Sequence, residues 1–322
     1  MLHVTKGGSA VAVLQHAGIE GDLLAWNDVL HEGPVRGDLP LTERRAERAA
    51  FIASQGWADD ARQVEADFQA RDERLARALD AGEPLALWFE HDLYDQWQLV
   101  EVLTRVAAIA GAGAEAELVL ASDYIVHFRP AAVHLAWDAR TRCTPLHLDA
   151  ALRAWDALTR ADPRGLNALR ASDTTALPQL HSALTRHAEE FPAVTTGLSR
   201  SERQLLEALE PGPRPLRELF AAAHHAREAA HFLGDTAFLS LVARLASAHA
   251  PLVRAVARAT DDARRDSWSR AVELTDAGVR ALAGEFDHAR TNRVSRWLGG
   301  TELGGNTADW RWDDVEQTIV RR

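Results

Sequence analysis

The chain has 322 residues, of which 47% are hydrophobic and 26% charged, as is usual for a soluble protein of two or three domains. Its net charge of −11 falls almost wholly on residues 1–144, where 13 Lys and Arg stand against 23 Asp and Glu, a balance of −10 that argues against nucleic-acid binding by this region. With no long apolar stretch, no export signal and Cys143 as the single cysteine, we expect a cytoplasmic protein without a membrane partner, an internal disulfide or a multi-cysteine zinc site.

Short apolar runs alternate with helical patterns in residues 1–144. The runs predict strands at 2–5, 22–26, 84–89 and 116–121. Apolar residues at helical spacing predict helices at 10–18, 41–54, 58–80 and 93–111. Strands that alternate with helices favour right-handed crossovers and a mainly parallel sheet, so we expect an α/β, Rossmann-like domain. The run 131–137 is expected to add an edge strand.

The rest of the chain is expected to form three further regions. Residues 145–198 predict a helical connector that Pro163 and Pro178 interrupt. Residues 199–285 open with a capping box and continue with the pattern of three helices and two strands, which favours a winged-helix-like domain. Its later elements are expected at 215–223, 235–248, 251–256 and 270–275. Residues 286–322 form a tail rich in Trp and Gly that we expect to pack on this domain.

Polar residues gather where each of the first four predicted strands ends. In parallel α/β sheets ligands bind beyond the carboxyl ends of the strands, because loops and helix N-termini converge there. The position of these clusters therefore predicts one binding site. Its candidate residues are Thr5, Lys6, Gly7, Gly8, Ser9, Asp28, Glu32, Glu90, His91, Asp92, Asp95, Gln96 and Asp123.

Four of these residues follow directly on the apolar run 84–89. Asp92 and Asp95 are explained equally well as the N-cap and first-turn acid of the next helix. That role leaves Glu90 and His91 unexplained, and a carboxylate beside an imidazole can act as general acid and base or ligate a divalent metal. Adjacent side chains of an extended segment point to opposite sides, so acid–base catalysis by Glu90 and His91 is favoured over a metal site, and the cofactor stays open.

The stretch Thr5-Lys6-Gly7-Gly8-Ser9 contains the only lysine of the chain and precedes a predicted helix. Its glycines would let the backbone approach an anion, and the helix would offer free N–H groups. It matches neither a Walker loop nor a G-x-G-x-x-G pattern, and a tight turn with Ser9 as N-cap explains it equally well.

The loop WNDVLHEGP (26–34) is richer in ionisable groups than a connector needs. Loops at strand ends carry function disproportionately, so Asp28 and Glu32 are expected to orient a substrate or a divalent ion. A solvated surface loop is the alternative interpretation.

The charges of the winged-helix-like region disfavour DNA as its partner. The expected recognition helix, 235–248, carries Arg244 as its only strongly basic residue. Arg264 and Arg265 at the expected wing tip could reach a phosphate, although three aspartates surround them. DNA binding stays open, and a protein partner or a structural role ranks ahead of it.

Several long motifs resemble the bacterial domain-of-unknown-function family 1835. In the N-terminal region these are WNDVLHEGP (26–34) and WFEHDLYDQ (88–96). The motifs FLGDTAFL (232–239), RWLGGTEL (296–303) and WRWDD (310–314) are similar to the domain that usually accompanies it. The resemblance covers most of the chain and implies family membership but no particular activity. Residues 6–9 lack the carboxylate of the Asn-Gly-Asp-Ser type of turn expected there, so a family activity that needs this group would be altered.

The leading hypothesis from the sequence is an α/β domain that binds a small phosphorylated or nucleotide-like ligand, with hydrolase or transferase activity as an extension. Residues 6–9 would hold the anion, and Glu90 or His91 would act as acid or base. The carboxylates that would orient the substrate or a divalent ion are Asp28, Glu32, Asp92 and Asp95. The competing hypothesis is a ligand-sensing regulator that acts on DNA or a transcription partner through residues 199–285. A third is an interaction module with no small-molecule ligand.

Overall fold

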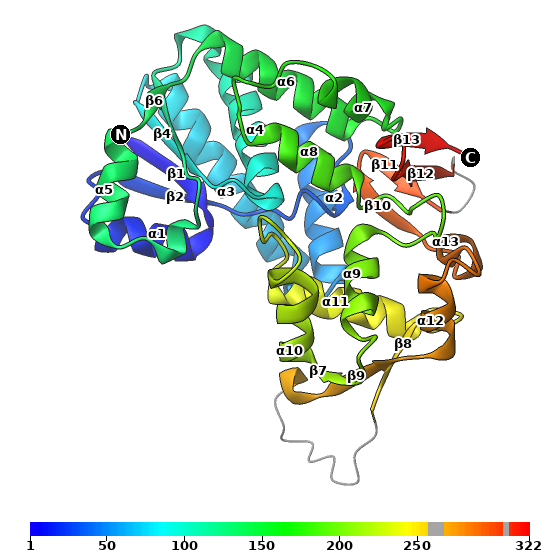
Figure 1. Ribbon diagram of the computed structural model, residues 1–322. Helices are drawn as coiled ribbons and strands as arrows, with labels where there is room; N and C mark the ends of the chain where they lie inside the picture. The colour runs from blue at the N-terminus through cyan, green and yellow to red at the C-terminus, as the bar shows by residue number, and fades with distance from the viewer. Residues whose placement is uncertain (257–266, 305–308) are drawn as a thin grey trace. The chain divides into compact units, whose positions relative to one another are not determined.

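The computed structural model describes residues 1–256, 267–304 and 309–322, which form two compact units (Figure 1). Unit 1 comprises Met1–Thr185 with Gly299–Thr301, and unit 2 comprises Arg186–Leu298 with Glu302–Arg322. The wing tip expected around Arg264 and Arg265 lies outside the described residues. Within the described ranges, no helix combines the length and the apolar character that crossing a lipid bilayer requires.

Unit 1 is built on a five-stranded sheet in the order β2-β1-β4-β5-β6. The strands are β1 (Leu2–Lys6), β2 (Asp22–Trp26), β4 (Leu85–Phe89), β5 (Ala116–Leu120) and β6 (Thr141–Arg142). The first four are parallel, and only β6 runs antiparallel, beside β5. The expectation of a mainly parallel α/β sheet is therefore confirmed.

The edge strand expected at 131–137 is wrong, because this segment forms the helix α5 (Pro130–Asp138). Proline favours the first turn of a helix, where its fixed φ fits and its missing N–H is not needed. Val133 and Trp137 then recur at helical spacing and pack on the same face of the sheet. The edge position is taken by β6, a two-residue strand a few residues further on.

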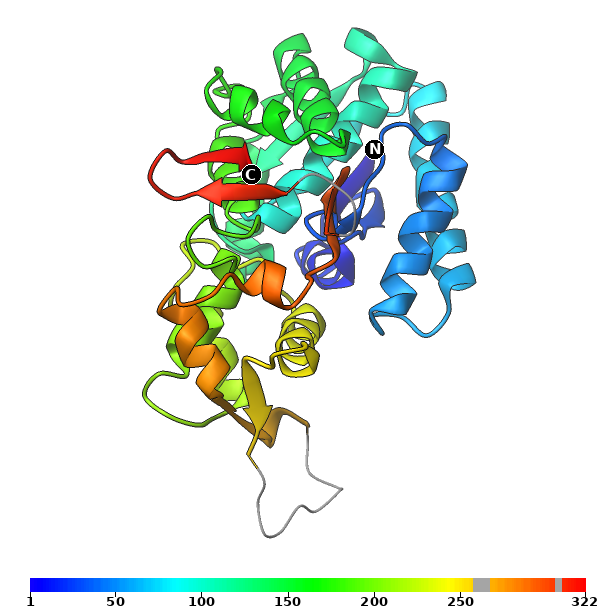
Figure 2. The ribbon, with the colours of Figure 1, turned by 90° about the vertical axis from the view of Figure 1, so that its right-hand side faces the viewer.

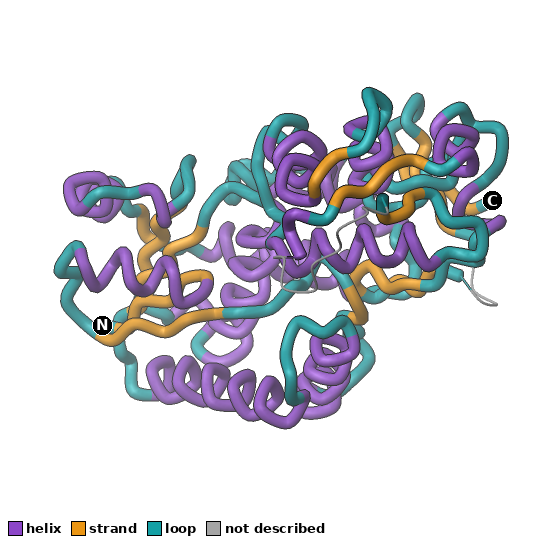
Figure 3. Tube along the Cα trace, turned by 90° about the horizontal axis from the view of Figure 1, so that it is seen from below, coloured by secondary structure: helices purple, strands orange, loops and turns teal. Residues whose placement is uncertain are grey.

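Helices cover both faces of the sheet in unit 1, and the strands near the N-terminus lie between helices in Figure 3. On one face, α1 (Gly7–His16), α5 and the short turn η2 (Ile125–His127) pack around Leu14 and Trp88. The other face carries α3 and α4, against which α2 and α6 pack. The remaining elements are β3 (Gly33–Pro34), α2 (Leu41–Ser54), α3 (Ala61–Asp80), α4 (Leu93–Ile109), η1 (Gly111–Gly113), α6 (Pro145–Thr159) and α7 (Arg164–Arg170).

The buried strand β4 and the arrangement of its neighbours define where a ligand can bind. All five residues of β4 are buried, as expected of a parallel strand covered on both faces. The chain passes from β1 to β2 through α1 on one face and reaches β4 through helices on the other face. β1 and β4 are therefore the neighbouring strands at which the order of the sheet reverses, and such a point opens a crevice at the strand ends.

Unit 2 combines short helices with small antiparallel sheets. Its core gathers Leu205, Leu219, Phe238 and Leu252 from the predicted helices and the strand region. The capping box of Ser199 with Glu202 is present at the start of α9. In Figure 2 the β12–β13 hairpin ends the chain in red. The elements are α9 (Arg200–Ala208), β7 (Arg214–Pro215), α10 (Leu216–Phe220), the π-helical turn η3 (Ala221–His225), α11 (Asp235–Ser247), β8 (Val253–Ala255), η4 (Ser267–Ser269), β9 (Ala271–Leu274), α12 (Asp276–Leu282), α13 (His288–Thr291), β12 (Trp310–Asp313) and β13 (Thr318–Arg321).

Three elements cross the boundary between the units. They are α8 (Leu180–Ala188), β10 (Arg296–Gly299) and β11 (Thr301–Leu303). Unit 1 contains residues 145–185 as well as the parallel sheet, so most of the predicted connector belongs to it.

Candidate binding site at the carboxyl ends of β1 and β4

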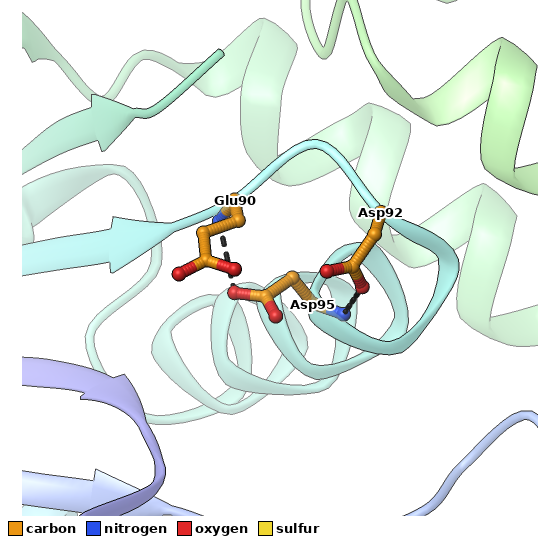
Figure 4. A group of neighbouring side chains, drawn as sticks. All are labelled: Glu90, Asp92 and Asp95. Carbon is orange, nitrogen blue, oxygen red and sulfur yellow. Dashed lines mark hydrogen bonds between the residues drawn. The ribbon is translucent and has the colours of Figure 1, made fainter. Parts of the chain in front are cut away.

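The turn that joins β4 to α4 is closed by its own side chains. Asp92 is the N-cap of α4, and its Oδ1 accepts from the Asp95 backbone N–H at 3.0 Å. Asp95 Oδ1 in turn accepts from the Glu90 backbone N–H at 2.8 Å, and Gln96 Nε2 donates to the Glu90 carbonyl at 2.6 Å. These bonds fix the carboxyl groups of Asp92 and Asp95 at the end of the strand (Figure 4), and the Glu90 carboxyl group is held by the Ile125 backbone N–H, which donates to its Oε1 at 2.7 Å.

Lys6, at the end of β1, places its ammonium among these three carboxyl groups. Its Nζ lies 2.5 Å from Glu90 Oε2, 2.8 Å from Asp95 Oδ2 and 3.3 Å from Asp92 Oδ2. The three carboxylate side chains are fully buried, whereas that of Lys6 keeps 24% of its surface exposed. Lys6 therefore separates the carboxylates from solvent. We call Lys6, Glu90, Asp92 and Asp95 the β1/β4 cluster.

The β1/β4 cluster contains three carboxyl groups and one ammonium group. Burial raises the pKa of Glu90 above its usual range, and Lys6 offsets this only in part. Burial and the neighbouring Asp92 carboxylate raise the pKa of Asp95 well above its usual value. For Lys6, burial alone would lower the pKa, but the three carboxylates, Asp95 foremost, raise it above the ordinary value. Lys6 stays an ammonium, so it is no nucleophile and forms no Schiff base.

The arrangement of oxygens fits a divalent cation. One oxygen from each of the three carboxylates can be chosen so that all lie within 4.8 Å of one another. Glu90 Oε2 and Asp95 Oδ2 are buried without an aligned hydrogen bond, although both lie at ion-pair distance from Lys6. Carboxylate oxygens are the ligands that Mg²⁺ and Mn²⁺ prefer. His91 does not belong to this group of ligand atoms.

Two tyrosine rings lie near the Lys6 ammonium. Its Nζ lies 5.8 Å from the ring centre of Tyr94 and 5.7 Å from that of Tyr124, within the range of cation–π attraction. The His91 ring lies 5.1 Å from Tyr124, and the His31 ring lies 6.0 Å from Tyr94. We call these two tyrosines and two histidines the aromatic rim.

The first turn of α1 begins at the same strand end. Lys6 is the N-cap of α1 and makes no side-chain cap bond, so Ser9 is not the cap that the sequence offered as an alternative. Gly8 and Ser9 are exposed, and the first turn carries no acid. Gly7 has a φ of +58°, and a Cβ there would lie 3.3 Å from Asn27 Oδ1, so a side chain would be strained. The start of α1 can thus offer backbone N–H groups to an anion.

Four further candidate residues lie outside the β1/β4 cluster. Asp28 forms a buried ion pair with Arg48 at 2.6 Å. Glu32 is buried, and its carbonyl accepts from Arg48 Nη1 at 2.8 Å. Asp123 is exposed, and its carboxylate accepts from the backbone N–H of the next residue. Thr5 is buried, and its hydroxyl has no hydrogen-bond partner within the described part of the chain.

Sequence reasoning did not find the aromatic rim or the contact of Lys6 with the carboxylates. Tyr94 and Tyr124 each follow a strand that was predicted correctly, so strand ends alone could have indicated them. The partner of Lys6 needs the strand order, because Glu90 lies 84 positions away. Among known proteins, no family model and no curated protein sequence matches the chain.

Proposed function

We propose that unit 1 binds a small phosphorylated or nucleotide-like ligand, together with a divalent cation, at the carboxyl ends of β1 and β4. The observation that carries the proposal is the three buried carboxylates that share one ammonium. Buried charges of one sign need compensation, and a divalent cation supplies what Lys6 leaves uncompensated. The cation would enter by displacing the partly exposed Lys6 side chain, and its charge would polarise a phosphoryl oxygen of the ligand.

The phosphate itself is assigned to the start of α1. The backbone N–H groups of Gly8 and Ser9 are the proposed donors, because both residues are exposed and the first turn of α1 carries no acid. Glu90 is the proposed acid or base for hydrolase or transferase chemistry, because its carboxyl group lies at the end of β4 within the cluster that would hold the cation. Tyr94 and Tyr124 offer faces for a nucleobase or a sugar.

The test is a thermal-shift comparison of the wild type with Glu90→Gln. Nucleotides and sugar phosphates are added with and without Mg²⁺ or Mn²⁺, because a ligand that binds only the folded state raises the melting temperature. We expect a shift that needs the metal and disappears in Glu90→Gln. Glu115→Gln, an exposed carboxylate of the same unit, should behave as the wild type. A well-folded protein that responds to none of these compounds would exclude the proposal and favour an interaction module.

A second proposal concerns residues 199–285. The order of α9, α10 and α11 followed by the antiparallel β8 and β9 supports a winged-helix-like module that signals ligand binding to a protein partner. We also propose a cytoplasmic location and membership of domain-of-unknown-function family 1835, on the motifs quoted above. Loss of a captured partner in Glu90→Gln, but not in Glu115→Gln, would support a ligand-sensing regulator.

A further inference from the structure

A crevice in unit 1 is lined by an unusual number of arginines. It lies among α2, α3, α4 and α6, away from the β1/β4 cluster contacts. Trp155 of α6 forms part of its wall. The five guanidinium groups that line it belong to Arg44, Arg45, Arg48, Arg71 and Arg105.

One of these arginines is fully neutralised within the fold. Arg48 is buried, pairs with Asp28 at 2.6 Å and donates to the carbonyls of Val29, Glu32 and Pro34. It acts as a structural link for the loop that follows β2. The charges of Arg48 and Asp28 therefore neutralise one another, and the other four arginines of the crevice need other counter-charges.

Two carboxylates form ion pairs with three of the remaining arginines. Asp72 lies 3.3 Å from Arg45, 3.5 Å from Arg71 and 3.8 Å from Arg105. Glu101 lies 3.4 Å from Arg71 and 3.1 Å from Arg105. Shared in this way, two negative charges cannot neutralise three guanidinium groups.

Arg44 adds a further uncompensated charge. Among the described residues its guanidinium forms no ion pair and no hydrogen bond, and it lies 5.4 Å over the ring of Trp155. Burial lowers the pKa of Arg44 and repulsion from Arg105 lowers it further, and attraction to Glu101, Asp72 and Asp28 offsets this only in part. Five guanidinium groups against Asp28, Asp72 and Glu101 leave an excess of two positive charges in a half-buried crevice.

We propose that Arg44, with Arg45 and Arg105, binds a small multiply charged oxyanion of the phosphate class at the mouth of this crevice. Guanidinium forks match phosphate oxygens in pairs, and a doubly charged anion cancels the excess. The interior has room for about 10 Å³, one water-sized sphere, so the anion sits outside it, where Arg44 is only partly buried. This site does not depend on the proposed function, because it uses other residues and needs no metal.

The experiment titrates the full chain with inorganic phosphate and pyrophosphate in EDTA at constant ionic strength, and follows the melting temperature. The variants are Arg44→Gln and the control Arg77→Gln, which removes one exposed guanidinium from α3 of the same unit. We expect a saturable rise in the wild type and in Arg77→Gln, and binding weaker by about tenfold or more in Arg44→Gln. Arg44→Lys should be intermediate, since it keeps the charge and loses the fork.

The anion-free state supplies an independent readout. Without phosphate, Arg44→Gln should melt at or above the wild-type temperature, because an uncompensated charge has been removed. A lower melting temperature would assign Arg44 a packing role on Trp155 and overturn the proposal. A rise that is equal in Arg44→Gln and wild type, or that never saturates, would be the general stabilisation that phosphate gives most proteins, and would overturn it as well.

Discussion

At the scale of single residues, Lys6 is the common ion-pair partner of three buried carboxylates in unit 1. Removing one partner of a buried ion pair leaves an uncompensated charge, and here three carboxylates share the same partner. We therefore expect Lys6→Met to lower the free energy of unfolding by about 3–5 kcal/mol. Urea unfolding followed by tryptophan fluorescence measures this loss.

The Lys6→Met variant also distinguishes a cation-binding site from an ion pair that only stabilises the fold. Mg²⁺ or Mn²⁺ should restore much of the stability lost in Lys6→Met, while affecting the wild type less, because the ammonium no longer competes for the carboxylate oxygens. Arg77→Met, at an exposed ion pair, is the control and should change stability by less than about 1 kcal/mol. A Lys6→Met protein as stable as the wild type would show that the carboxylates are already neutralised by protons.

The candidate residues could be found from the sequence, but their partners could not. Glu90, Asp92 and Asp95 stand out because polar groups directly follow a buried strand. The contact of Lys6 with Glu90 depends on β1 lying beside β4, and strand order is a long-range property that no local pattern contains. Asp28 shows the opposite case, since a polar loop residue proved to be a buried structural partner of Arg48.

At the scale of elements, the π-helical turn η3 depends on a neutral histidine. His224 is buried, and its Nε2 accepts from the backbone N–H groups of Phe232 and Leu233 at 3.0 and 3.1 Å. Burial lowers the pKa of His224 to about 3, and Arg186 and His225 contribute to the same direction. In the unfolded chain His224 therefore binds a proton below about pH 6.5, whereas in the folded chain it binds one only near pH 3.

The resulting prediction concerns acid stability. As the pH falls from 6.5 towards 3, His224 should lower the free energy of unfolding by up to about 1.4 kcal/mol per pH unit. His224→Gln keeps an acceptor for the two N–H groups and cannot titrate, so its stability should depend less on pH between 6.5 and 5. Denaturant unfolding at a series of pH values tests this. Equal slopes for the two proteins would contradict a buried neutral imidazole.

Most elements could be placed from periodicity, and the failures have local causes. The strands 2–5, 22–26, 84–89 and 116–121 are present almost as predicted, because the strands of a parallel sheet covered by helices are continuous apolar runs. The segment 131–137 is too short and too apolar for its period to decide between strand and helix, and Pro130 determined the outcome.

At the scale of the whole molecule, unit 1 is discontinuous in sequence. Gly299 O accepts from the Val35 N–H at 2.8 Å, and the Gly300 N–H donates to Leu158 O at 2.8 Å. A Cβ on Gly300 would lie 2.0 Å from Thr159 O, so only glycine fits against the end of α6. No sequence pattern indicated that residues so late in the chain complete the first unit.

We expect Gly300→Ala to lower the free energy of unfolding by about 1–3 kcal/mol or more, because the added methyl group meets backbone that cannot move aside. Gly113→Ala, at a glycine with open space around it, should have little effect. Amide hydrogen exchange should show the loss at the end of α6. Protection there equal to that of the wild type would mean that Gly299–Thr301 contributes little to unit 1.

Gly299–Thr301 is synthesised long after the rest of unit 1, and this affects how unit 1 folds on the ribosome. Roughly 110 residues of unit 2 are made between Thr185 and Gly299, and at roughly 5–20 residues per second this takes on the order of 10 s. During that interval the nascent sheet lacks the segment that covers the end of α6. The growing chain is therefore exposed to chaperones and proteases in a nearly finished state, and unit 1 completes its folding only after most of unit 2 has been translated.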